Sequence, residues 1–191
     1  MAGRYFFIKM GIKIKKVKLS RGNKAEVSYF DEEGNSVVFR GDFKCHKDMV
    51  SAMNSLIPYF AEITEQAESA SIDWRNINSD KNVSLLRKLE VTGISISEDV
   101  INRTVTLSGR RTLMSSKSLI INAPCVDMTD TTWRLLNEFD LAVEGVIFEA
   151  TEYVIRHKCD ELQTEIDFGT DDPFAVTQTT ECAWDITDNV E

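Results

Sequence analysis

The amino-acid sequence predicts an α+β fold in which two long helices cover one face of an antiparallel sheet. Short stretches of alternating apolar and polar residues, typical of half-buried strands, occur in two groups of three. Each group is followed by a longer stretch whose apolar residues recur every three or four positions, as they do in an amphipathic helix. Packing both helices on one face of the sheet would bury both apolar stripes. The chain is therefore expected to use a strand-strand-strand-helix plan twice.

The first unit covers about residues 10–68. Its first strand changes its alternation at Lys15 and Lys16, which predicts a β-bulge. Acidic residues followed by Gly and Asn separate its second and third strands, as expected of a hairpin turn. A helix is predicted at about 46–68, and Pro58 should kink or restart it. The predicted strands are 12–19, 25–30 and 36–40.

The second unit follows a polar connection and ends in the longer of the two helices, at about 131–157. Asp130 or Thr131 can cap the start of this helix. Basic residues in its last turn suit the negative end of the helix dipole. Its predicted strands are 89–97, 103–107 and 118–123. The single domain expected over 1–158 divides into unit one at 10–68, the connection at 69–86 and unit two at 87–158.

The composition is that of a globular protein without a membrane anchor. Hydrophobic residues make up 42% and charged residues 28% of the chain, which is ordinary for a folded domain in water. The longest apolar runs are too short to cross a bilayer. The apolar run from Tyr5 to Ile8 is also too short for the core of a signal peptide. The sequence therefore predicts a cytoplasmic protein.

The negative charge of the chain is concentrated at one end. Residues 159–191 contain ten carboxylates and no Lys or Arg, whereas the rest of the chain has 22 basic and 21 acidic residues. A block of one charge sign is usually an interaction tail. Aromatic residues within this block indicate that it binds a protein partner. The residues predicted to do so are Asp171, Asp172, Phe174 and Trp184.

One short motif in this tail resembles a known family. The run Asp171-Asp172-Pro173-Phe174 is similar to the acidic-aromatic tip of bacterial and phage single-stranded DNA-binding proteins. In that family the Phe is the last residue and its carboxylate takes part in recognition, whereas 17 residues follow Phe174 here. The resemblance covers four residues and implies a regulatory tail that recruits partners. The two predicted helices distinguish the body from the five-stranded barrel usual in that family.

Basic residues gather in the first unit. Residues 1–50 contain 11 Lys or Arg against 6 acids, with aromatic residues interleaved. Basic sheets with exposed rings bind single strands through phosphate contacts and base stacking. The alternative is that the lysines lie on the solvent side of an amphipathic strand and the rings lie in the core. The residues predicted to bind nucleic acid are Lys13, Lys15, Lys16, Lys18, Arg21, Lys24, Arg110, Arg111 and Lys117, with Tyr5, Phe6, Phe7, Tyr29 and Phe30 as stacking candidates.

Enzyme signatures are absent from the sequence. It has no phosphate-binding loop, no dinucleotide fingerprint, no nucleophile elbow and no metalloprotease motif, and it has only two histidines. The sequence therefore predicts a protein that is not an enzyme and needs no cofactor. Each histidine neighbours a cysteine or lies two residues from one, so a tetrahedral zinc site could form if the two segments met. Its ligands would be Cys45, His46, His157 and Cys159. The alternative is a buried Cys45 and a surface His157.

These observations favour a non-enzymatic binding protein of DNA metabolism. The first reading is a phage-type single-stranded DNA-binding or recombination accessory protein in the host cytoplasm, with a tail that regulates binding or recruits partners. The alternative is a protein-interaction module, either a virion or assembly component or an acidic inhibitor that mimics DNA. A homo-oligomer is possible in both. The first reading requires the basic residues to gather on one face.

Overall fold

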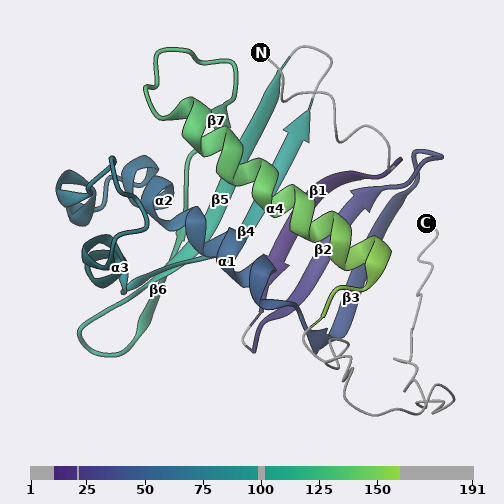
Figure 1. Cartoon of the computed structure of the whole chain (residues 1–191), viewed down its shortest axis with the longest axis horizontal. Coiled ribbons are helices and arrows are strands. Elements are labelled where there is room, and N and C mark those ends of the chain that lie inside the picture. The colour runs from purple at the N-terminus through teal and green to yellow at the C-terminus, as the bar shows by residue number, and fades with distance from the viewer. Residues whose placement is uncertain (1–10, 21, 99–101, 160–191) are drawn as a thin grey trace, which may run out of the picture.

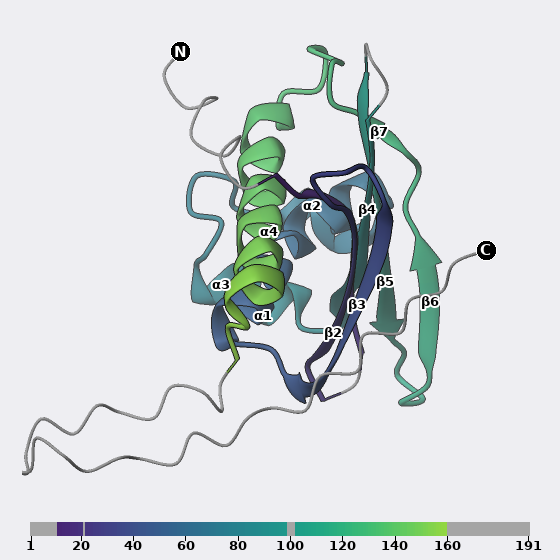
Figure 2. The ribbon, with the colours of Figure 1, turned by 90° about the vertical axis from the view of Figure 1, so that its right-hand side faces the viewer.

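The computed structural model of the chain describes residues 11–20, 22–98 and 102–159. Over these residues the chain forms one 7-stranded antiparallel sheet, with every helix on the same side (Figures 1 and 2). The predicted α+β fold is therefore confirmed. The strands are β1 Lys13–Leu19, β2 Lys24–Phe30, β3 Ser36–Lys44, β4 Leu89–Glu98, β5 Arg103–Thr112, β6 Ser118–Asn122 and β7 Val126–Asp127.

The two predicted units form the two halves of this sheet. The strand order is β3-β2-β1-β4-β5-β6, and β7 also pairs with β5. Each unit therefore places its first strand in the middle and its later strands toward an edge. The predicted bulge is confirmed, because the pairing register of β1 with β2 shifts between Ile14 and Lys16. The acidic hairpin turn is formed as its residues predict, with the Asp31 carboxylate accepting the N–H groups of Glu33 and Asn35.

The first helical stretch is divided where proline predicts. The helices are α1 Lys47–Ser55, α2 Ile57–Ile63, the 3-10 helix η1 Ala67–Ser71, α3 Asp80–Leu86 and α4 Leu136–Arg156. Pro58 lies in the first turn of α2, where its missing N–H costs nothing. The helix then ends at Ile63, before the predicted Glu68. Thr64 bonds back to the Phe60 carbonyl, and Glu65 adopts a left-handed φ of 52°.

The polar connection between the units contains helix α3, which the sequence analysis missed. Ser79 caps it by accepting the N–H of Asn82. Asn82 is 1% exposed, and its side chain bonds the main chain of Asp73, Asn76 and Ile77. A buried amide that is fully hydrogen-bonded fixes the surrounding loop, whereas an unpaired one would be costly. The polar residues of this segment, which are typical of a loop in the sequence, therefore include a buried side chain that holds the segment together by hydrogen bonds.

Helix α4 begins five residues later than predicted. Asp130 does not cap it; its carboxylate instead accepts the N–H and hydroxyl of Thr132 in the preceding turn. The residue before the helix is Leu135, which makes no side-chain cap. The chain leaves the other end at His157, in a left-handed conformation with φ of 54°.

The core lies between the sheet and the helices. Helix α4 runs diagonally across the sheet beside α1 (Figure 1). Fully buried rings from both units meet there: Phe60 and Phe139 have no exposed surface, and Tyr153 packs against Phe39 and Phe43 of β3. A helix of the second unit thus covers strands of the first, which joins the units in one core.

A close approach of Phe60 to the sheet requires glycine at position 109. A Cβ at Gly109 would lie 2.7 Å from the Phe60 ring and would collide with the Glu90 carbonyl. We expect Gly109→Ala to lower the free energy of unfolding by roughly 1–3 kcal/mol in urea titrations. The matched control is Gly145→Ala on α4, where the new methyl meets nothing within 4 Å. That variant should gain roughly 1 kcal/mol from helix propensity. Equal effects would contradict the packing at Gly109.

Candidate nucleic-acid interface

The sheet face that points away from the helices is polar. Val17, Val27 and Val105 are fully buried against the helices, so the residues that alternate with them face outward. The pairing register aligns these outward residues in rows that cross the sheet. One row is Val38, Ser28, Lys16, Ser95 and Thr106. The next row is Arg40, Glu26, Lys18, Gly93, Ser108 and Asn122. We call this surface the open face.

The open face carries a net positive charge. The described cations on it include Lys15, Lys16, Lys18, Lys24, Arg40, Lys44 and Arg110, whereas the described carboxylates include Glu26 and Glu90, so cations are in excess. Glu26 accepts a hydrogen bond from Arg40 at 2.8 Å and pairs with Lys18 at 3.4 Å. The Arg40 hydrogen bond is the main reason that the pKa of Glu26 is lowered. Exposed ion pairs of this kind are weak, so a phosphate can compete for the same cations.

One aromatic ring lies on the open face beside these cations. The Lys15 ammonium sits 4.1 Å from the centroid of the Phe30 ring. Tyr29 points the other way and packs against the core. The other three predicted stacking residues, Tyr5, Phe6 and Phe7, lie outside the described residues. Phe30 is therefore the stacking candidate that the geometry supports.

The structure separates the other predicted cations from this group. Arg111 lies on the helix side, where it binds Glu68 at 2.6 Å and Gln66 at 2.8 Å. Lys13 is the register partner of Phe30 and so lies at the rim of the open face, where it forms an ion pair with Glu98 at 2.6 Å. Lys117 lies in the β5–β6 turn, and Arg21 lies outside the described residues. Of the predicted set, the open face therefore unites Lys15, Lys16, Lys18, Lys24 and Arg110.

Arg40 is the functional candidate that sequence reasoning missed. It lies between Phe39 and Gly41, both of which face Tyr153, so alternation turns Arg40 outward. The sequence could have indicated this, because Val37, Phe39 and Gly41 share one side of an alternating strand. Arg40 stands apart in the sequence from the dense lysine run of β1, so composition alone does not single it out.

Helix α4, which covers the other face of the sheet, is acidic. Helix α4 has five carboxylates and one basic residue, namely Glu138, Asp140, Glu144, Glu149, Glu152 and Arg156. Arg103 of β5 reaches this side and donates to Asp140 at 3.1 Å and Glu144 at 2.6 Å. Charge is thus segregated across the domain, with cations in excess on the open face and carboxylates along α4.

The four predicted zinc ligands gather at one corner but do not form a metal site. Cys45 and Cys159 are partners in an isolated antiparallel bridge. His46 instead caps α1, its Nδ1 accepting the Asp48 N–H at 3.2 Å. The His157 ring stacks on Phe39, 6.0 Å between centroids. Within the described ranges, no three His, Cys, Asp or Glu side chains are placed to share an ion. Each histidine has a local structural partner, His46 with Asp48 and His157 with Phe39.

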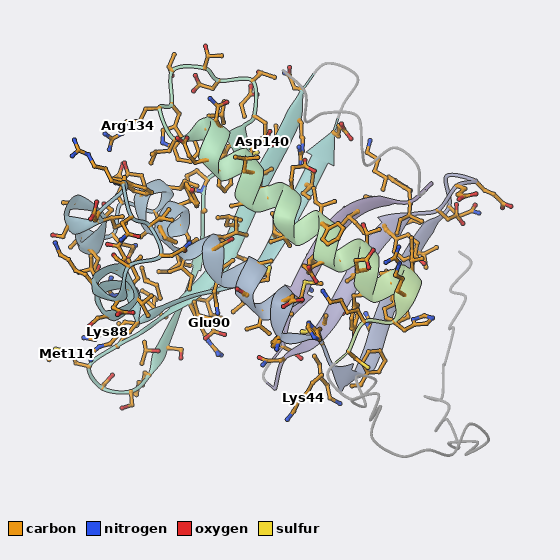
Figure 3. The ribbon with its side chains drawn as sticks, in the orientation of Figure 1. Lys44, Lys88, Glu90, Met114, Arg134 and Asp140 are labelled. Carbon is orange, nitrogen blue, oxygen red and sulfur yellow. The ribbon has the colours of Figure 1, made fainter. Side chains whose placement is uncertain are left out.

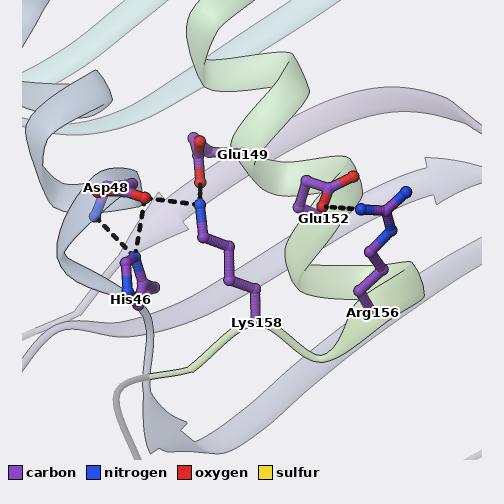
Figure 4. Close-up of polar contacts among 6 residues, drawn as sticks. All are labelled: His46, Asp48, Glu149, Glu152, Arg156 and Lys158. Carbon is purple, nitrogen blue, oxygen red and sulfur yellow. Dashed lines mark hydrogen bonds and ion pairs between the residues drawn. The ribbon is translucent and has the colours of Figure 1, made fainter. Parts of the chain in front are cut away.

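A polar network ties the end of α4 to the start of α1 at this corner. The Lys158 ammonium donates to Asp48 at 2.7 Å and to Glu149 at 2.8 Å (Figure 4). This network lowers the pKa of Asp48, chiefly through the hydrogen bond from Lys158. Cys159 follows Lys158 in the chain, and the acidic tail begins there. The predicted partner-binding residues Asp171, Asp172, Phe174 and Trp184 lie outside the described residues.

Comparison with protein-family models, with curated proteins and with solved structures finds no match to the chain. The helices of the described ranges do not combine the length and apolarity needed to cross a membrane. The function therefore has to be argued from the arrangement of the chain's own residues.

The Arg111–Glu68 pair predicts how stability depends on pH. The Arg111 hydrogen bond lowers the pKa of Glu68 below 4.5 in the folded state. The pair therefore stabilises the fold fully above about pH 4.5, and the gain is lost as pH falls through the lowered pKa. We expect Glu68→Gln to cost roughly 1 kcal/mol at pH 7 and progressively less in acid, as measured by urea unfolding. The exposed neighbour Glu65→Gln is the control. A pH-independent loss would show that the charge on Glu68 is not the cause.

Proposed function

We propose that the open face binds single-stranded nucleic acid, DNA in the first instance, and that the protein acts as a non-enzymatic binding or recombination accessory protein of phage type. The observation that carries the proposal is the segregation of charge. The pairing register sets Lys16 and Lys18 among serines and threonines on one face, while the carboxylates of α4 lie on the other. A basic, hydroxyl-rich surface is the electrostatic footprint expected of a phosphate binder.

The spacing of the β-strands supports successive contacts along a single-stranded nucleic acid. Neighbouring strands lie about 4.8 Å apart, so Arg40 on β3 and Lys18 on β1, which share a row, are separated by roughly 10 Å. Arg110 lies two strands beyond β1 and two residues along β5 from that row. Serine and threonine hydroxyls between them can donate to phosphate oxygens. Phe30 offers a ring on which a base can stack, which is sequence-tolerant. Such a site would bind a single strand with little base preference.

The start of the acidic tail supports a regulatory role for it. Cys159 pairs with Cys45, whose N–H donates to the Asn23 carbonyl at 2.8 Å. Along β2 and β3 the neighbouring register pair is Lys24 with Lys44. The Lys44 side chain extends from the end of β3 (Figure 3). The chain therefore enters its acidic segment beside basic residues at the border of the open face. We propose that this segment competes with nucleic acid for those cations, through the Coulomb attraction that phosphates also use.

Binding of labelled oligonucleotides, measured by fluorescence anisotropy over a range of salt, tests the interface. We expect a double variant, Lys16→Gln with Lys18→Gln, to weaken single-stranded DNA binding roughly tenfold at low salt and to reduce the salt slope by about 1.4. Truncation after Cys159 should tighten binding. The matched control is Lys81→Gln with Arg87→Gln, which removes two exposed charges at α3 on the helix side.

The outcomes separate the alternatives. Equal losses in the two double variants would locate binding elsewhere than on the open face. Failure of both the full chain and the truncated chain to bind single-stranded DNA, single-stranded RNA or duplex would overturn the proposal and favour a protein partner. Weaker binding after truncation would mean that the tail contributes contacts instead of competing for them.

A second candidate function, assembly through strand pairing, is favoured by the exposed edge of β6. The N–H of Leu113 donates to the Lys117 carbonyl, and the N–H of Ala123 donates to the Leu107 carbonyl. Because hydrogen-bonded and non-hydrogen-bonded pairs alternate along an antiparallel ladder, Arg110 and Ile120 form a non-hydrogen-bonded pair. The N–H and C=O groups of Ile120 therefore point away from β5. Of the described strands, none pairs with that edge. Ile120 is 77% exposed, and Met114 projects from the adjoining turn (Figure 3). β6 has no charged residue, whereas edge strands usually carry charges that prevent pairing.

A second copy of β6 is the occupant that fits this edge. An antiparallel pair centred on Ile120 would place Leu119 opposite Ile121 of the other copy, so apolar side chains meet on both faces. We expect light scattering after size exclusion to show a concentration-dependent dimer that Ile120→Lys converts to a monomer. Val38→Lys, on the opposite edge strand, should leave the dimer intact. A monomer at all concentrations would contradict this assembly.

A further inference from the structure

The fold brings two cysteines from opposite ends of the domain directly opposite one another. Cys45 follows β3 and Cys159 follows α4, 114 positions later in the chain. They are the two residues of an isolated antiparallel bridge, and each is 1% exposed. They are not joined by a disulfide in the structure. The third cysteine of the described residues, Cys125, is exposed and lies elsewhere, near β7.

The kind of bridge determines how close the two cysteines are. The Cys45 N–H donates to the Asn23 carbonyl at 2.8 Å, so the main chain of Cys45 is hydrogen-bonded on the side away from Cys159. The pair is therefore of the non-hydrogen-bonded kind, in which opposite Cα atoms are about 4.5 Å apart and the side chains approach most closely. Disulfides form at Cα separations of about 4.4–6.8 Å. The main chain therefore holds the two Cα atoms at a separation that a disulfide can span.

Contacts on both sides of the bridge fix this alignment. Lys158 bonds Asp48 and Glu149, and the His157 ring stacks on Phe39. The Cys45 strand is held from the other side by Asn23. An alignment fixed by groups other than the cysteines themselves is preorganised for bond formation. Burial keeps both thiols from solvent, so reaction requires the short segment 157–159 to open first.

We propose that Cys45 and Cys159 form a reversible redox site that closes to an intramolecular disulfide. The oxidant is a small-molecule disulfide such as oxidised glutathione. The thiolate of one cysteine attacks it, forming a mixed disulfide and releasing one glutathione. The second cysteine then attacks the protein sulfur of that mixed disulfide and releases the second glutathione. Two protein thiols are oxidised to one disulfide, the oxidised glutathione is reduced to two thiols, and both protons leave with them.

The disulfide would fasten the start of the acidic segment to the end of β3. In the reduced protein Cys159 is held beside Cys45 by the bridge, the Lys158 ion pairs and the His157 ring contact, all of which can open. In the oxidised protein the first residue of the acidic segment stays beside Lys24 and Lys44 at all times. The proposal is independent of what the open face binds, because its readout is the covalent bond itself.

Peptide mapping of the wild-type full chain by mass spectrometry tests the proposal. After equilibration with oxidised glutathione, a linked peptide that joins Cys45 to Cys159, lighter by two hydrogens, should appear and should vanish with reductant. The oxidised protein should melt roughly 10 °C higher, because the cross-link closes a long loop of the unfolded chain. Cys125→Ser with Cys182→Ser is the control variant, and it should still form the link.

Two results would overturn the proposal. One is mapping in which Cys45 and Cys159 remain thiols in oxidised glutathione while the exposed Cys125 is modified. The other is a stable mixed disulfide with glutathione on either residue, which would mean that the partner thiol cannot reach it. Because mapping uses the unmodified protein, a variant that fails to fold does not obscure either result.

Discussion

The pairing of β1 with β4 is the contact on which the rest of the structure depends. Among the described strands it is the single place where the two units pair, and it consists of Lys16 with Ser95, Val17 with Ile94 and Lys18 with Gly93. Val17 is fully buried there, and a Cβ at Gly93 would press on the Ser108 hydroxyl. So short a ladder could not hold two half-sheets in register without support. Helix α4 supplies it by packing Tyr153 against β3.

The pairing of β1 with β4 also determines where the candidate interface lies in the sheet. Because β1 lies at the centre of the sheet, its lysines occupy the middle of the open face and not an edge. The units contribute unequally to this face. The first brings the lysines and Arg40, and the second brings the hydroxyls of β4 and β5 together with Arg110. Each unit already sets a hydroxyl near a cation, Ser28 beside Lys16 in the first and Ser108 near Arg110 in the second, and the joined sheet makes this mixture continuous across the open face.

The sequence was informative where a local pattern decides the outcome and uninformative where distant segments do. Alternation and the three-to-four-residue stripe predicted the strands and helices, and Lys15-Lys16 and Pro58 predicted the bulge and the helix break. Helix α3 escaped notice because its stability comes from the buried amide of Asn82, which looks like any loop residue in a sequence. Arg110 and Arg111 look equivalent in the sequence, yet alternation sends them to opposite faces. The meeting of Cys45 with Cys159 depends on where α4 ends in space, which no local pattern encodes.

The route of the chain has a further consequence. Residues 45–88, which link β3 to β4, stay on the helix side, and the described hairpin turns lie at the ends of the strands (Figure 2). No described segment passes over the middle of the open face. A polymer could therefore settle on this surface sideways, at any point along its length, without a free end to thread. A surface of this kind is suited to gaps and loops within long molecules as much as to their termini.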